Sequence, residues 1–361
     1  FRHLDRHFFV QMASPFQEFF LILKRGGWVG VDLFFVLSGF LVTTILLAEL
    51  RTKGSVDSAR FLIRRGFKIY PAFFLCLGGA ALFHNYVNDT PLISAPLVRE
   101  MFFVQNYSAG FYPHTWSLAV EEHFYLLITL FFWAVGRHQS IHHLPRWVAG
   151  IAVTTLGLRF ASLWWPTVFP SFHGFSTHLR VDGLFLGALL AYTHHFYRQS
   201  FQETVYRFRY PASVLVVAGL LPAFLWELNT PYLQTAGLTM LALGCGVIVS
   251  FAATLSLPSH WLTRCLVEPF RYVGKHSYSI YLWHIVFQDF LGYFLRQTAF
   301  YQQQSNLTLF LFTLAGNLIL GILLSYIIEY PCLRLREAWF PTDYGHDRKQ
   351  PELSERTQPV V

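Results

Sequence analysis

Nine apolar stretches, each long enough to cross a lipid bilayer, constrain the fold of this chain more than any other feature. A helix rises 1.5 Å per residue, so about 20 residues cross the ~30 Å hydrocarbon core of a membrane. We predict spans at residues 29–48, 69–87, 115–135, 147–166, 179–197, 211–228, 233–256, 273–295 and 307–330. The pattern indicates an all-α integral membrane protein folded as a multi-span helical bundle.

Composition excludes a soluble enzyme. The chain is 54% hydrophobic and only 13% charged, about half of the ~25% charge of an average soluble domain. Its net charge of +7 is distributed between the apolar stretches, which is typical of membrane topology and does not indicate nucleic-acid binding. The 4 cysteines lie far apart without a CxxC spacing, so we expect no metal site.

The distribution of lysine and arginine predicts the orientation in the membrane. Of the 27 such residues, the loop after the first predicted span, alternate later loops and the C-terminal tail hold 19, and the opposite side holds seven. Loops rich in these residues stay in the cytoplasm. We therefore expect both termini to be cytoplasmic, with one transmembrane domain over residues 1–336 and a short, disordered tail over 337–361.

The N-terminal segment predicts a further span. The chain begins at Phe1, and the residues before Trp28 look like the end of a span followed by a loop. We expect the N-terminus of this first span to be missing, which gives ten spans in the complete protein.

Ionisable residues inside the predicted spans are the best candidates for a functional site, because each costs ~2.5–3.5 kcal/mol to insert. They are Asp32, Glu121, Glu122, Arg180 and Asp182. The structural alternative is that they only pair with one another or with Arg159.

Helical spacing orders the residues around the two adjacent glutamates. Ser117 and Tyr125 each lie four residues from Glu121, and therefore on the same helix face, whereas Glu122 points about 100° away. We expect one of the two carboxylates to face the interior of the bundle.

Five sequence runs carry a family resemblance: GVDLFFVLSGFL, RRGFKIYP, TWSLAVEEHFYLL, RVDGLFLGALLA and SYSIYLWH, in that order between Gly26 and Pro331. Together they resemble the acyltransferase 3 family. The resemblance implies a membrane enzyme that moves an acyl group, often acetyl, from cytoplasmic acyl-CoA to a hydroxyl of a cell-surface or lipid-linked saccharide. It implies a bacterial inner membrane, acyl-CoA as donor substrate without a permanently bound cofactor, and leaves the oligomeric state open.

The resemblance also implies a catalytic histidine on the first span, ten residues after an arginine or lysine. Eleven residues of helix advance ~16 Å and complete about three turns, so the two groups share a face. The matching histidine is His3, with its basic partner before Phe1, and His7 is the alternative. A histidine with a pKa near 6.5 can act as a general base or carry the acyl group itself. Both routes stay open.

The family's RxxR element aligns with Arg65 and Lys68, where lysine replaces the second arginine. With Arg64, these residues are the predicted donor-binding cluster, because coenzyme A carries several phosphates. The alternative is that the cluster only anchors the protein to anionic lipid.

The remaining expectations concern the cavity. Glu121 or Glu122 is expected to hold the catalytic imidazole in its reactive tautomer. The predicted cavity-lining residues are Asp32, Ser38, Gly39, Trp116, Ser117, Arg180, Asp182 and His284. His284 is followed five residues later by Asp289, which imitates an HxxxxD acyltransferase motif, and we discount this match.

Two other functions fit a many-span bundle with buried charges. One is a transporter or channel, because such charges also mark permeation paths, although we find no internal repeat to support it. The other is a lipid-modifying acyltransferase of an unrelated family. Thioester cleavage that depends on His3 and on the acceptor distinguishes the predicted enzyme from a transporter.

Overall fold

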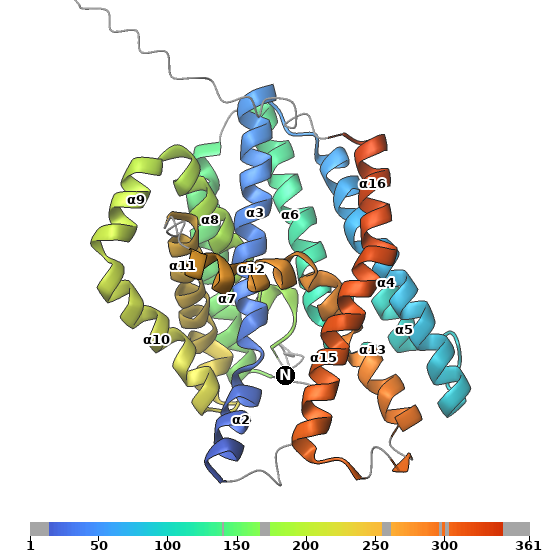
Figure 1. Cartoon of the computed structure of the whole chain (residues 1–361). Coiled ribbons are helices and arrows are strands. Elements are labelled where there is room, and N and C mark those ends of the chain that lie inside the picture. The colour runs from blue at the N-terminus through green and yellow to red at the C-terminus, as the bar shows by residue number, and fades with distance from the viewer. Residues whose placement is uncertain are drawn as a thin grey trace, which may run out of the picture.

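The computed structural model describes residues 14–138, 141–166, 174–254, 261–295, 298–299 and 303–341. Within these ranges the chain is helical, with turns between the helices and no strand. Most of the longer helices run alongside one another, and α12 lies across the others (Figure 1). The predicted all-α bundle is therefore confirmed.

The helices begin and end as follows: α2 (Ser14–Gly26), α3 (Val29–Lys53), α4 (Ser58–Asn88), α5 (Ala95–Met101), α6 (Trp116–His138), α7 (Leu144–Trp164), α8 (Asp182–Phe196), α9 (Arg198–Arg207), α10 (Arg209–Leu225), α11 (Leu238–Thr254), α12 (Trp261–Lys275), α13 (Ser277–Leu295), α15 (Asn306–Leu324) and α16 (Tyr330–Trp339). Short turns of 3₁₀ or π type add η1 (Ile141–His143), η2 (Thr177–Leu179), η3 (Leu233–Gly237) and η4 (Ser325–Glu329). Each predicted span coincides with one of these helices.

Six helical stretches among the described residues are long and apolar enough to cross a membrane, or seven if α9 and α10, bent by 76°, form one span. The six are Gln17–Lys53, Ser58–Asn88, Trp116–Val135, Ile141–Trp164, Leu233–Thr254 and Asn306–Trp339. Helices α8 and α13, which match the predicted spans 179–197 and 273–295, are not among them. The multi-span architecture is confirmed, and the count of nine or ten stays a prediction.

The segment before Trp28 differs from the expectation of a loop. Helix α2 extends to Gly26 and is separated from α3 by a short turn. Arg25 fastens this helix to the end of α10, donating to the carbonyl of Leu225 at 2.8 Å and lying 3.3 Å from Glu227. The apolar residues of this segment pack as a helix, and the residues before Ser14 lie outside the described part of the chain.

Helices α3 and α8 form the closest helix pair of the bundle. A side-chain carbon added at Gly39 would lie 1.9 Å from the carbonyl oxygen of Leu184, and one added at Gly187 would lie 2.1 Å from that of Val36. Only glycine allows two helix backbones to approach this closely. The contact brings the polar residues of α3 beside the start of α8.

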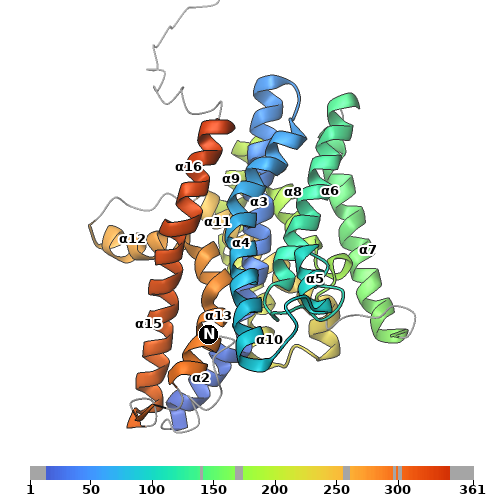
Figure 2. The ribbon, with the colours of Figure 1, turned by 90° about the vertical axis from the view of Figure 1, so that its right-hand side faces the viewer.

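A tight turn joins α3 to α4 at the end of the bundle that we call the basic end (the top of Figure 1). Gly54 ends α3 in the left-handed conformation with φ of 74°, which is a common helix terminus. The side chain of Asp57 begins α4 by accepting a hydrogen bond of 2.9 Å from the backbone of Arg60. Helix α16 finishes beside α4 at the same end (Figure 2).

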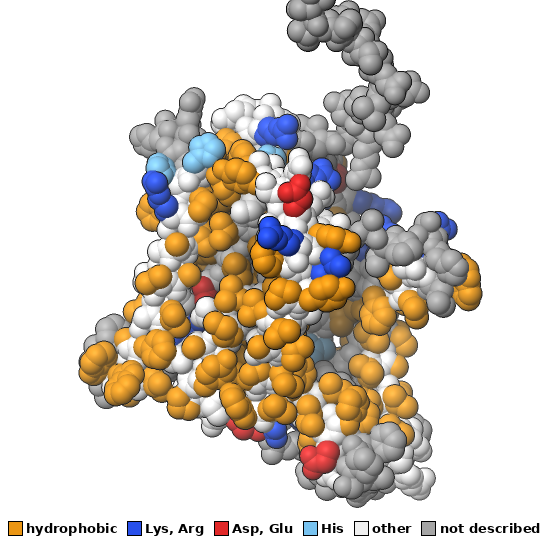
Figure 3. Space-filling model, turned by 90° about the vertical axis from the view of Figure 1, so that its left-hand side faces the viewer, with side chains coloured by type: hydrophobic (Ala, Val, Ile, Leu, Met, Phe, Trp, Pro, Cys, Tyr) orange, Lys and Arg blue, Asp and Glu red, His pale blue; other side chains and the backbone are white. Residues whose placement is uncertain are grey.

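The surface matches a membrane protein with one basic end. Hydrophobic side chains cover most of the face in Figure 3, and most of the lysine and arginine side chains on that face lie in its upper half.

The beginning of the predicted tail is structured. Glu337 lies 2.8 Å from Arg64 of α4, which also donates to the carbonyl of Phe340. The described residues therefore continue past the predicted boundary at residue 336 to Pro341, and residues 342–361 lie outside the described part of the chain.

Candidate active site

A basic pocket of about 560 Å³ opens between α3, α4 and α16 at the basic end of the bundle. Its cationic side chains are Lys53, Arg60, Arg64, Arg65, Lys68 and Arg336. All three predicted donor-binding residues are therefore part of one cavity. Glu49 lies 3.5 Å from Lys53, and Glu337 lies 2.8 Å from Arg64 and 2.6 Å from Arg336. The pocket's cationic side chains still outnumber these two carboxylates.

Arg65 connects the basic pocket to the interior of the bundle. Its guanidinium lies 5.4 Å from the ring centres of both Phe61 and Tyr125, within the range of a cation–π interaction. Lys68 follows almost one turn further along α4, toward the membrane interior. The basic charge thus extends inward from the mouth of the pocket.

The central carboxylate cluster consists of Ser38, Glu121 and Tyr125, and Arg65 packs over the ring of Tyr125. The hydroxyl of Ser38 donates to Oε1 of Glu121 at 2.5 Å, and the hydroxyl of Tyr125 donates to the same oxygen. Tyr125 is the side chain four residues from Glu121 that helical spacing places on its face. Two hydroxyl donors thus satisfy the hydrogen-bonding capacity of this buried carboxylate oxygen.

Both adjacent glutamates are buried, which corrects the expectation that only one faces inward. Glu121 is 4% exposed and Glu122 is 9% exposed. Oε2 of Glu122 accepts from Tyr70 of α4 at 2.9 Å, whereas Glu121 faces Ser38 of α3. The 100° between the two side chains thus directs them at different neighbouring helices instead of placing one outside.

The α3 wall of the basic pocket leads to Ser38. Ile45 lines that pocket, and Ser38 lies seven residues earlier, two helical turns away and on the same face. The central carboxylate cluster therefore lies along the same face of α3 as the wall of the basic pocket, two helical turns deeper.

A second cavity, the histidine pocket, lies in the opposite half of the bundle and measures about 460 Å³. It is formed by the starts of α3 and α6, the turn before α11 and the middle of α13. Its polar and aromatic side chains include Trp28, His114, Trp116, Phe175, Arg180, Gln234, Tyr281 and His284. Three predicted cavity residues, Trp116, Arg180 and His284, are therefore brought together.

His114 and His284 pack edge to face in this pocket, with ring centres 4.8 Å apart. Nδ1 of His284 lies 2.6 Å from the carbonyl of Tyr281, and Nε2 of His114 lies 3.1 Å from the carbonyl of Leu282. Because a carbonyl only accepts, these contacts assign a proton to each of those nitrogens. In the neutral rings the other nitrogen is then the acceptor.

Tyr281 joins the histidine pocket to the same face of α6 that carries Glu121. Its hydroxyl lies 2.6 Å from Oγ of Ser117 and 2.5 Å from the carbonyl of His114. Ser117 is one turn before Glu121 on that face. A column of polar groups on α6 therefore extends from the histidine pocket to the central carboxylate cluster.

Two buried ion pairs support the wall of the histidine pocket. Arg180 contacts both carboxylate oxygens of Asp32 at 2.8 and 2.9 Å, and Arg159 contacts Asp182 at 2.7 Å. Arg180 also lies 5.2 Å from the ring centre of Trp116. Asp32 and Asp182 thus hold arginines in place, as the structural alternative predicts.

Other predicted residues have different surroundings. Gly39 packs against the α8 backbone, as described above, where a small residue is needed for helix packing. Asp289 lies 3.6 Å from His84 of α4, so the aspartate of the discounted HxxxxD match has a histidine on another helix as its neighbour. His3 and His7 lie outside the described residues. Among residues that are described, no group of three or more side chains is placed to hold a metal ion.

The sequence reasoning missed His114, Tyr281 and Tyr70 as site residues. His114 directly precedes the TWSLAVEEHFYLL run, and Tyr281 lies inside SYSIYLWH. Their position within or beside runs that carry the resemblance is the signal that could have identified them.

A cationic pocket at one end of the bundle and a histidine pocket in the other half, with the buried Glu121 between them, suit an enzyme that transfers a group between two substrates. Comparison with known families makes the class specific. Residues 4–326 match the family model described as an acyltransferase domain, and the chain belongs to this acyltransferase 3 family.

Several bacterial proteins are similar to the chain. Peptidoglycan O-acetyltransferase OatA of Listeria monocytogenes is 30% identical over 294 residues, covering 72% of this chain and 44% of the relative. A putative O-acetyltransferase of Staphylococcus aureus (strain COL) is 27% identical over 296 residues, covering 74% and 47%. Putative peptidoglycan O-acetyltransferase YrhL of Bacillus subtilis is 27% identical over 288 residues, covering 72% and 44%.

The chain matches less than half of the length of these relatives. No solved structure matches it significantly.

Proposed function

We propose that this chain is a membrane O-acyltransferase that moves an acyl group, acetyl in the simplest case, from acyl-CoA to a saccharide hydroxyl. One observation carries the proposal: a basic pocket and a histidine pocket open in opposite halves of one bundle, with Glu121 between them. Family membership supports acyl transfer. The names of the relatives support a cell-wall saccharide such as peptidoglycan as the acceptor.

The basic pocket is the proposed donor site. Its arginine side chains suit the phosphates of coenzyme A, because a guanidinium binds a phosphate through two parallel hydrogen bonds. The positive-inside distribution predicts that this end faces the cytoplasm, where acyl-CoA is available. The acyl-bearing arm then extends along the face of α3 that carries Ile45 and Ser38, which brings the thioester toward Glu121.

The histidine pocket is the proposed acceptor site. Aromatic walls with a few polar groups are typical of small-molecule pockets, and here Trp116 and Phe175 stack with ring centres 4.7 Å apart. His284 and Arg180 line the pocket with nitrogen groups of the kind that form hydrogen bonds to a saccharide. The predicted orientation places this pocket in the outer half of the membrane.

The chemical step needs a base, and His3 is the proposed one, with His7 as the alternative. The neutral imidazole takes the proton of the acceptor hydroxyl, the oxygen attacks the thioester carbonyl, and the carbon–sulfur bond breaks. The imidazolium then returns the proton to the departing thiolate. In the alternative route the imidazole nitrogen attacks the thioester carbonyl, the carbon–sulfur bond breaks, and the thiolate leaves with the proton of the other ring nitrogen. The hydroxyl oxygen then attacks the acyl-imidazole, and the imidazole departs with the hydroxyl proton. Glu121 or Glu122 is proposed to orient the imidazole in either route.

Release of coenzyme A from acetyl-CoA tests this function. The chain is purified in lipid and incubated with acetyl-CoA and peptidoglycan fragments. We expect thiol release together with an acetylated saccharide, and a loss of about 100-fold or more for His3→Ala.

Two outcomes would contradict the proposal. Acetyl-CoA binding without thiol release for any saccharide would support a transporter. Equal thiol release by the wild type, His3→Ala and His7→Ala would show that neither histidine is the catalytic base.

A further inference from the structure

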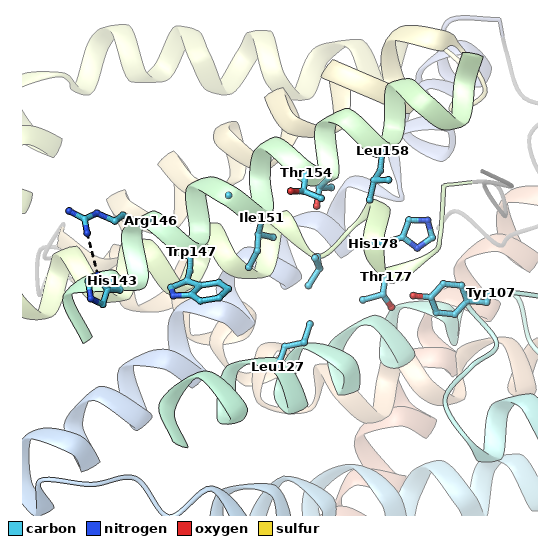
Figure 4. Close-up of a pocket in the computed structure, with 13 residues that line it drawn as sticks. Tyr107, Leu127, His143, Arg146, Trp147, Ile151, Thr154, Leu158, Thr177 and His178 are labelled. Atoms are coloured by element: carbon cyan, nitrogen blue, oxygen red, sulfur yellow. Dashed lines mark hydrogen bonds between the residues drawn. The ribbon is translucent and has the colours of Figure 1, made fainter. Parts of the chain in front are cut away.

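A third cavity, the α6–α7 groove, measures about 710 Å³ and contains none of the predicted site residues. Helix α7 packs mainly on α8, which leaves the groove open between α7 and α6 (Figure 4). Both helices are candidate membrane spans. The groove therefore opens at the depth of the lipid acyl chains.

The middle of the groove is mostly apolar, with Thr154 and Thr155 of α7 as its polar side chains. Leu127 of α6 faces Ile151 of α7, and Leu158 continues the apolar wall (Figure 4). From Arg146 to Leu158, twelve residues later, the helix rises ~18 Å. One leaflet contributes about half of the ~30 Å hydrocarbon core, so the groove matches the length of a single lipid chain.

One end of the groove carries positive charge. Arg146 and His143 lie there with Nη1 and Nδ1 3.4 Å apart (Figure 4). Arg146 is exposed, and the described residues place no carboxylate within 4 Å of it. This end belongs to the basic end of the bundle, which we predict to be cytoplasmic. The cytoplasmic leaflet is the one that carries anionic lipid.

We propose that the α6–α7 groove binds one anionic glycerophospholipid of the cytoplasmic leaflet. Its phosphate lies at Arg146 and His143, and one acyl chain lies between Leu127 and Ile151. An acyl chain suits the groove better than a saccharide does, because most of the surface that lines the groove is apolar. The proposal does not depend on the catalytic activity proposed above.

The far end of the groove connects the bound lipid to the histidine pocket. Thr177 lines this end, and its hydroxyl lies 2.7 Å from Nδ2 of Asn106 and 2.6 Å from Nδ1 of His123. The same short turn, η2, leads directly into Arg180. A chain that fills the groove therefore supports the segment that positions Arg180, and we expect bound lipid to raise the melting temperature.

Two glycines of α7 supply a matched pair of variants. A side-chain carbon added at Gly150 or at Gly157 meets no atom within 4 Å, so neither position is sterically restricted. Gly150 lines the groove, whereas Gly157 does not. Gly150→Leu thus occupies the space of the lipid chain, and Gly157→Leu makes the same change on the same helix outside the groove.

The test uses the full chain in nanodiscs that contain phosphatidylglycerol with a photoreactive group on its acyl chain. After illumination we expect crosslinks in the wild type on α6 near Leu127 and on α7 near Ile151. Gly150→Leu should lose these crosslinks several-fold, and Gly157→Leu should keep them. Arg146→Gln should lose the preference for phosphatidylglycerol over phosphatidylcholine, and Arg198→Gln, an exposed control on α9, should retain it.

Four results would overturn the proposal. The first is crosslinks spread evenly over the lipid-facing helices of the wild type, a result that needs no variant to fold. The second is equal labelling by phosphatidylcholine and phosphatidylglycerol in the wild type. The third is unchanged crosslinking in Gly150→Leu at a wild-type melting temperature. Displacement by a polyprenyl phosphate but not by phosphatidylglycerol would assign the groove to a different lipid and also contradict the proposal.

Discussion

Ser38 of α3 donates a hydrogen bond of 2.5 Å to Glu121 of α6, and this contact lies between the two pockets of the bundle. It joins the α3 face that lines the basic pocket to the α6 face that leads to Tyr281. A hydroxyl that donates to a buried carboxylate forms a short, charge-assisted bond. The residue pair is thus the structural connection between the proposed donor site and the proposed acceptor site.

Replacement of Glu121 by glutamine should therefore reduce acyl transfer strongly. The amide keeps the size of the side chain but removes the negative charge that orients an imidazole. We expect a loss of about 100-fold or more in kcat, measured as thiol release from acetyl-CoA. Glu203→Gln on the exposed helix α9 is the control and should retain full activity. Wild-type activity in Glu121→Gln would remove this carboxylate from the mechanism.

Substitutions in the basic pocket should change KM for the donor, acetyl-CoA, without changing KM for the acceptor. Arg65→Gln should raise KM for acetyl-CoA about 10- to 100-fold, because a hydrogen bond to a charged group contributes ~1.5–3 kcal/mol. Lys68→Arg restores the second arginine of the RxxR element and should lower that KM. Both values are measured by initial rates at varied acetyl-CoA, with Arg198→Gln as control. An unchanged KM in Arg65→Gln would favour the lipid-anchor interpretation of the cluster.

The buried pair Asp32–Arg180 predicts an effect on stability. Asp32→Asn leaves the Arg180 guanidinium without its charged partner and should cost ~3–5 kcal/mol of unfolding free energy. Thermal unfolding in lipid measures the change. The exposed pair Glu268–Arg271, 3.2 Å apart, supplies the control, because Glu268→Gln should change stability by less than ~1 kcal/mol. A melting temperature in Asp32→Asn equal to that of Glu268→Gln would contradict a structural role for the buried pair.

Glu100 of α5, outside the candidate spans, predicts a pH dependence. Burial raises the pKa of this carboxyl from its ordinary value of 4.5 to about 7. Between these two pH values the folded state keeps a proton that the unfolded state releases. The protonated carboxyl therefore contributes up to about 3 kcal/mol to the free energy of unfolding below pH ~4.5, and this contribution is lost as the pH rises through ~7.

The variant Glu100→Gln tests that pH dependence. Oε1 of Glu100 accepts from the backbone of Tyr112 at 2.7 Å and from Thr115 at 2.9 Å, and the glutamine oxygen can retain both bonds. We expect its melting temperature to change less between pH 5 and pH 8 than that of the wild type. Identical pH profiles for the two proteins would assign the titration to another group.

Local patterns could be predicted from the sequence, and contacts between distant segments could not. Apolar length identifies the helices, and the four-residue spacing correctly places Tyr125 beside Glu121. Ser38 and Glu121 lie 83 residues apart in sequence, so no periodicity relates them. The pairing of Arg180 with Asp32 likewise depends on the close packing of α3 and α8, and a sequence pattern alone predicts only that buried charges need partners.

A variant in each pocket should change KM for a different substrate. This comparison tests whether the donor and acceptor sites are separate. His284 lines the histidine pocket with its ring oriented by the carbonyl of Tyr281. His284→Ala removes the hydrogen-bond acceptor offered to a saccharide and should raise KM for the acceptor about tenfold, the effect of ~1.4 kcal/mol. KM for acetyl-CoA should stay unchanged, whereas Arg65→Gln should show the reverse. His284→Gln, which keeps a hydrogen-bonding group, should recover part of the loss. Since the two cavities lie in opposite halves of the bundle, a parallel change of both KM values in either variant would contradict separate donor and acceptor sites.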